Sequence, residues 1–160
     1  MSLRRILKSL FSGVGPKIDD LVSTLLLLHE PEVFLEWQYA AAIEKSWGPS
    51  EWNHVVVQGP LAFLQIDGIL VHAVCGRRPY WTSKKNLPAW ADHDAFMTVD
   101  HMSPKSDDEA RYAVIARLVL ALLTENCVAA FSPALGGLVR NDESLKERLR
   151  VMADSCRATG

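Results

Sequence analysis

Residues 76–91, GRRPYWTSKKNLPAWA, gather the side chains best suited to binding an anionic compound. A guanidinium or ammonium group binds phosphate, and an aromatic ring stacks on a base or a sugar. The segment contains no acidic residue. It therefore predicts a ligand site formed by the candidate residues Arg77, Arg78, Tyr80, Trp81, Lys84, Lys85 and Trp90. In the alternative interpretation, Tyr80 and Trp81 pack under the edge of a sheet and the loop binds nothing.

Catalytic and metal-binding patterns have weaker support. The chain has no P-loop, no dinucleotide fingerprint, no GxSxG and no HExxH. His72 and Cys75 are three residues apart in an expected strand, so their side chains point to opposite faces. Cys127 follows the C-terminus of an expected helix, whose negative end raises the pKa of a thiol. We therefore expect no catalytic residue, no metal ion and no cofactor.

The composition describes one ordinary globular domain. The chain has 160 residues, is 49% hydrophobic and carries a formal net charge of -2, which disfavours nucleic acid as a partner. Cys75, Cys127 and Cys156 are an odd number with no close spacing, as expected for reduced thiols in a cytoplasmic protein. No apolar run reaches the roughly 18 residues of a membrane span, so we expect no transmembrane segment.

The first residues have the periodicity of an amphipathic helix. Arg4, Arg5 and Lys8 lie opposite an apolar stripe, and glycines at 13 and 15 end the pattern. We predict a helix over residues 1–15 that precedes a single α+β domain over 16–160. Residues 2–11 could contact a partner or an anionic membrane. The stripe consists of Leu3, Ile6, Leu7, Leu10 and Phe11.

A β-hairpin is the clearest structural signal. The runs 61–66 and 69–75 flank Asp67-Gly68, the preferred two-residue turn, which would pair Ile66 with Ile69. One face of this hairpin is entirely apolar. The other is mostly apolar too, so we expect both faces to be covered. The second face consists of Leu61, Phe63, Gln65, Leu70, His72 and Val74.

The remaining pattern predicts an α+β fold: a mainly antiparallel sheet with two long helices packed on one face, plus the N-terminal helix. Further strands are expected at 21–28, 95–102 and 127–131. A helix should begin at Pro31, with Trp37 and Ala41 in its apolar stripe. A long helix over 107–125 should be capped by Ser106 and Glu109, and a final helix by Asn141 or Asp142.

The order of these segments resembles that of a known family. LLLL before a helix, LAFLQIDGILVHAV, a Pro-aromatic loop, PAW, HDAFMTVD and CVAAFSPALGGLV after a long helix follow one another between about Asp20 and Arg150. This arrangement resembles an uncharacterised bacterial family, domain of unknown function 4261. The resemblance implies an α+β fold and carries over no activity.

The apolar second face of the hairpin and the N-terminal stripe favour a non-catalytic interaction module. We expect it to act through self-association or a protein partner. The interface candidates are Leu3, Ile6, Leu7, Leu10 and Phe11 from the N-terminal stripe, and Phe63, Leu70, His72 and Val74 from the hairpin. The alternative is a small-ligand binder or enzyme that uses loop 76–91 for an anionic compound.

Overall fold

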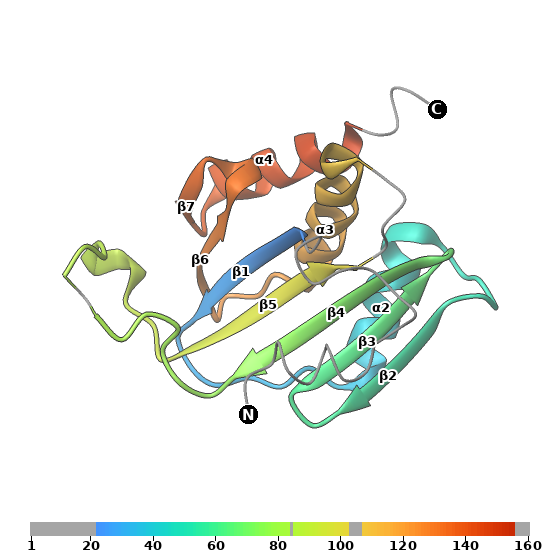
Figure 1. Cartoon of the computed structure of the whole chain (residues 1–160), viewed down its shortest axis with the longest axis horizontal. Coiled ribbons are helices and arrows are strands. Elements are labelled where there is room, and N and C mark those ends of the chain that lie inside the picture. Colours follow the sequence, from blue (N-terminus) through green and yellow to red (C-terminus); the bar gives the residue numbers. More distant parts are fainter. Residues whose placement is uncertain (1–21, 84, 103–106, 156–160) are drawn as a thin grey trace.

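A computed structural model describes residues 22–155, apart from 84 and 103–106, and its strands form one antiparallel sheet (Figure 1). The strand order is β2-β3-β4-β5-β1-β6-β7. This confirms the predicted α+β class and antiparallel sheet. The predicted N-terminal helix lies outside the described residues. The strands are β1 (Val22–Leu28), β2 (His54–Gln58), β3 (Leu61–Ile66), β4 (Ile69–Gly76), β5 (Ala95–His101), β6 (Cys127–Ser132) and β7 (Gly137–Arg140).

The β3–β4 hairpin has the predicted register. Ile66 pairs with Ile69 across the turn. Asp67 has a φ of 48° and Gly68 a φ of 83°, the left-handed conformation that this two-residue turn needs at both positions. The turn therefore decides which hairpin residues face each side of the sheet.

Three helices cover the first face of the sheet: α2 (Glu36–Trp47), α3 (Asp108–Leu122) and α4 (Glu143–Asp154). The prediction of two covering helices is therefore wrong for the described residues. The short α4 adds the third, because Leu145 and Leu149 are buried in the same core as the sheet residues. Burial of large aliphatic side chains between the two layers is the main stabilising contribution.

Helix α2 begins at Glu36 rather than at Pro31. Gln38 accepts a hydrogen bond from the Leu35 N–H at 2.7 Å, which fixes the start of the helix. The buried residues are Tyr39, Ala42 and Ile43, whereas Trp37 is 67% exposed. The predicted stripe is therefore wrong at Trp37 and Ala41, which are both exposed, because the helix is rotated so that Tyr39, Ala42 and Ile43 face the sheet.

Two further details differ from the sequence-based expectation. Strand β2 was not predicted, although its alternating exposure is that of a half-buried strand. Helix α3 is capped by Asp107, whose carboxylate accepts a hydrogen bond from the Ala110 N–H at 2.8 Å. Ser106, the predicted cap, lies outside the described residues. The predicted cap Asp142 does begin α4.

Candidate functional site

The loop between β4 and β5 packs on the second face of the sheet, opposite the helices. Trp81 and Leu87 are half-buried against a small core that contains Leu25, Leu27 and Ala129. The Trp81 ring contacts Phe131 edge-on, with centroids 5.6 Å apart. Trp81 therefore packs as the alternative interpretation expected and is not a free platform for a ligand, whereas Tyr80 is 47% exposed.

His93 forms hydrogen bonds with both ends of this loop. Its Nδ1 lies 2.8 Å from the carbonyl oxygen of Ala91, and its Nε2 accepts a hydrogen bond from the Tyr80 N–H at 3.1 Å. The two contacts require a neutral ring with its proton on Nδ1. His93 is 4% exposed. It is therefore a structural residue that joins the two ends of the loop.

The other loop candidates are spread over the surface. Arg77, Arg78 and Lys85 are exposed, as are Tyr80 and Trp90, while Lys84 lies outside the described residues. Trp81 lines an apolar cavity of about 360 Å³ beside β6 and β7, and Trp90 lines a separate polar cavity. None of the described loop cations lines either cavity. The described cations of the loop therefore do not share a cavity with Trp81 or Trp90.

A row of five residues crosses the second face of the sheet from β1 to β2. Direct cross-strand pairing places Ser23 beside Asp100, Asp100 beside His72, His72 beside Phe63 and Phe63 beside Val56. Paired residues share a face of an antiparallel sheet. The row thus joins three polar residues, far apart in sequence, to two apolar ones.

The polar end of this row has the residue types of a catalytic triad but not its arrangement. The Ser23 hydroxyl donates a hydrogen bond to Asp100. His72 Nδ1 lies 3.7 Å from the other oxygen of that carboxylate. In a triad the imidazole stands between hydroxyl and carboxylate, so that it can take the hydroxyl proton. Here the carboxylate stands in the middle, so His72 is not placed to take the proton of Ser23.

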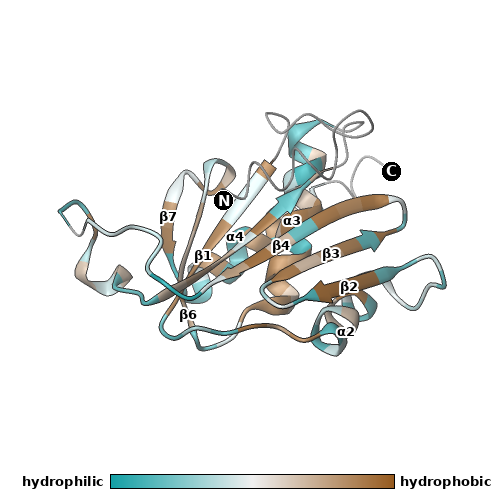
Figure 2. Ribbon diagram, turned by 60° about the horizontal axis from the view of Figure 1, so that its bottom comes forward, coloured by the Kyte–Doolittle hydropathy of each residue, from teal (hydrophilic) through white to brown (hydrophobic). Residues whose placement is uncertain are grey.

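The apolar part of the second face is formed by β2, β3 and β4. We call it the hairpin face: Val56, Leu61, Phe63, Leu70, His72 and Val74. Figure 2 shows hydrophobic ribbon along much of these three strands. Phe63, Leu70 and Val74 are half-buried, Val56 is 52% exposed, and the Phe63 ring contacts His72 with centroids 4.7 Å apart. The helices α2, α3 and α4 all pack on the opposite face. The N-terminal interface candidates lie outside the described residues.

The two edge strands of the sheet differ in their protection. Strand β7 has four residues and ends in Arg140. A short strand and a charge are two devices that keep an edge from pairing with another chain. Strand β2 has five residues, His54–Gln58, with no Lys, Arg, Asp, Glu or Pro among them. Its middle residue is the exposed Val56. The edge beside the hairpin face is therefore the open one.

The buried cysteines are not nucleophiles. Burial raises the pKa of the Cys75 thiol and raises that of Cys127 to about 12. The raised value for Cys127 was predicted, but its cause is burial rather than the helix end. Cys156 lies outside the described residues. Within the described part of the chain, no three His, Cys, Asp or Glu side chains gather as metal ligands.

No protein-family model, no curated protein and no solved structure matches this chain. The resemblance to domain of unknown function 4261 therefore stays a prediction. Among the described residues, no helix is long and apolar enough to cross a membrane.

Proposed function

We propose that the chain is a non-catalytic interaction module that binds a second copy of itself through strand β2 and the adjoining hairpin face. The observation that supports this most strongly is the uncharged edge of β2. Natural sheet edges that stay unpaired are usually short, charged, bulged or interrupted by proline. An edge that lacks these features favours β-sheet addition by another chain.

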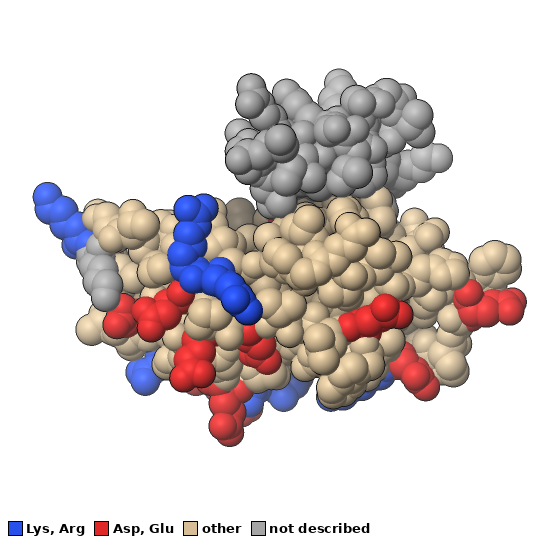
Figure 3. Space-filling model, turned by 90° about the horizontal axis from the view of Figure 1, so that it is seen from below, with Lys and Arg blue, Asp and Glu red and all other residues tan. Residues whose placement is uncertain are grey.

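The sequence of β2 suits pairing with itself. In an antiparallel pair centred on Val56, that residue faces Val56 of the second copy, and His54 faces Gln58. The interface is then isologous, since each copy offers the same strand, and the assembly closes as a dimer. The paired sheets would place the two hairpin faces side by side. Uncharged residues form most of the side of the molecule on which β2 lies (Figure 3).

The chemistry of the second face favours binding over catalysis. The Ser23 hydroxyl donates to the Asp100 carboxylate and not to His72, so these three residues do not form the relay of a catalytic triad. The Asp100–His72 pair is itself buried, with His72 1% and Asp100 6% exposed, so the part of this face that can meet a partner is the apolar part around Val56, which is 52% exposed. The predicted interface residues of the N-terminal segment, Leu7 and Leu10 among them, lie outside the described residues and stay a prediction.

Light scattering coupled to gel filtration tests the proposal on the full chain. We expect a dimer whose fraction rises with concentration, and we expect Val56→Lys to yield a folded monomer, because a lysine at its centre protects the edge. Val151→Lys is the matched control: Val151 is 63% exposed on α4, away from strand β2. A monomeric wild type at high concentration, or a dimer unaffected by Val56→Lys, contradicts the proposal. A heterogeneous complex would point to a protein partner instead.

A further inference from the structure

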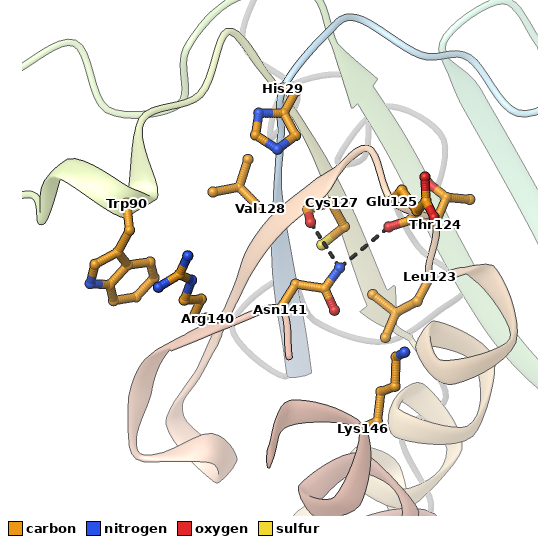
Figure 4. Close-up of a pocket in the computed structure, with 10 residues that line it drawn as sticks. All are labelled: His29, Trp90, Leu123, Thr124, Glu125, Cys127, Val128, Arg140, Asn141 and Lys146. Atoms are coloured by element: carbon orange, nitrogen blue, oxygen red, sulfur yellow. Dashed lines mark hydrogen bonds between the residues drawn. The ribbon is translucent and has the colours of Figure 1, made fainter. Parts of the chain in front are cut away.

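A polar cavity of about 520 Å³ opens at the β7 end of the molecule, where several segments meet. Its wall includes His29 after β1, Trp90 in the short helix η2 (Ala89–Ala91), Glu125 after α3, Arg140 at the end of β7 and Lys146 in the first turns of α4 (Figure 4). The volume lies within the range of small-molecule sites. Strand β2 lies at the other edge of the sheet, so this cavity is independent of the proposed dimer.

Hydrogen bonds hold the wall in place. Asn141 donates from Nδ2 to the carbonyl oxygens of Cys127, at 2.8 Å, and Thr124, at 3.3 Å. Its own N–H donates to the Val128 carbonyl at 2.9 Å. The backbone N–H of His29 donates to the Asn126 carbonyl at 2.9 Å. The cavity is therefore largely preformed, which lowers the entropic cost of binding a ligand.

One end of the cavity combines a cation with a ring. In Figure 4 the Arg140 guanidinium lies next to the Trp90 indole. Trp90 is 38% exposed, and Arg140 is exposed, with a side chain that forms no hydrogen bond or ion pair with another described residue. A guanidinium without a partner binds phosphate or carboxylate, and an exposed indole stacks on a planar ring.

The rest of the wall is mixed in charge. Lys146 adds a second cation, held at 3.2 Å from Glu143 on the helix surface. Glu125 is the one acid among the lining residues, and Figure 4 shows it across the cavity from Trp90 and Arg140. A carboxylate in this position suits the hydroxyl or amino donors of a ligand rather than its anionic group.

We propose that this cavity binds a small anion that carries an aromatic ring, of the class of a nucleoside monophosphate. The ring stacks on Trp90 and the phosphate pairs with Arg140, with Lys146 as a second cation and Glu125 facing the sugar hydroxyls. Loop 76–91 thus contributes one of its predicted ligand residues, Trp90, while the cations come from β7 and α4.

Isothermal titration of the full chain with AMP, adenosine and inorganic phosphate tests this site. We expect AMP to bind more tightly than either fragment, since only AMP uses both ring and phosphate. Trp90→Ala and Arg140→Gln should each weaken AMP binding by about tenfold or more. The matched controls are Trp52→Ala and Arg150→Gln, since Trp52 is 70% exposed and Arg150 lies on the exposed surface of α4.

Three results would overturn the inference. They are no heat of binding at millimolar AMP, inorganic phosphate binding as tightly as AMP, and equal losses in the two control variants. Each variant is checked for an unchanged circular dichroism spectrum, so that a lost site is distinguished from a lost fold.

Discussion

The stability of this protein should fall as the pH is lowered toward 5, and His101 should account for a defined part of the loss. His101 lies on β5 against α3 and is 1% exposed. Burial, and then the nearby Arg111 guanidinium, lower its pKa from 6.5 to about 4. Arg111 is held in place by a hydrogen bond from Nη2 to the His101 carbonyl at 3.2 Å.

The direction follows from proton linkage. Between the two pKa values the unfolded chain binds a proton at His101 that the folded chain does not. The stability that His101 contributes is therefore complete above about pH 6.5 and is lost as the pH falls toward about 4. From about pH 6.5 down to pH 5, which is about 1.5 pH units, the unfolding free energy falls by about 1.4 kcal/mol per unit. His101 therefore accounts for a loss of about 2 kcal/mol at pH 5.

Urea unfolding of the wild type and of His101→Gln, at about pH 7.5 and about pH 5, measures this quantity. We expect the difference in unfolding free energy between the two proteins to change by about 2 kcal/mol between the two pH values. Equal pH dependence in wild type and His101→Gln would refute the reasoning.

Three further predictions concern the loop, β4 and the thiols. Gly76→Ala should destabilise the fold by about 1–3 kcal/mol, because the new Cβ would lie 2.2 Å from the Phe96 ring, and Gly76→Ala with Phe96→Leu should recover part of that loss in thermal melts. His93→Ala should speed proteolysis within residues 77–92, because both hydrogen bonds that close the loop are lost. A cleavage rate equal to that of the wild type would contradict this. Cys75 and Cys127 should react with a thiol reagent only after unfolding, and rapid labelling of the native chain at either position would count against their burial.

The parts of the fold that were predictable are encoded locally. Asp67 and Gly68 are adjacent, and their conformations set the register of the whole hairpin. Asp142 caps α4 through hydrogen bonds from residues two and three positions later. Signals of this kind need only neighbouring residues, so a sequence reveals them.

The errors arose where tertiary contacts decide the structure. Trp37 suggested a buried stripe, but α2 turns Tyr39 and Ile43 toward the sheet instead. The segment His54–Gln58 is too short to stand out from the turns around it, and pairing with β3 is what makes it a strand.

The candidate sites could not be read from the chain because their residues are distant in sequence. Ser23, Asp100 and His72 come together only through the pairing of β1, β5 and β4. Trp90 was predicted as a ligand residue, but its companion Arg140 is fifty positions further on and showed no pattern of its own. The strand order of the sheet brings together both the row of Ser23, Asp100 and His72 and the cavity at Arg140, and no local motif specifies that order.

Amide hydrogen exchange of the full chain at low and high protein concentration tests the proposed self-association most directly. If β2 pairs with β2 of a second copy, exchange at Val55, Val56 and Val57 should slow as the concentration rises, while the β7 edge keeps its rate. Because consecutive amides of an edge strand alternate between the neighbouring strand and the open edge, the slowing applies to those β2 amides that do not face β3. Exchange at these amides that does not depend on concentration, in a sample that remains monomeric, would contradict the account.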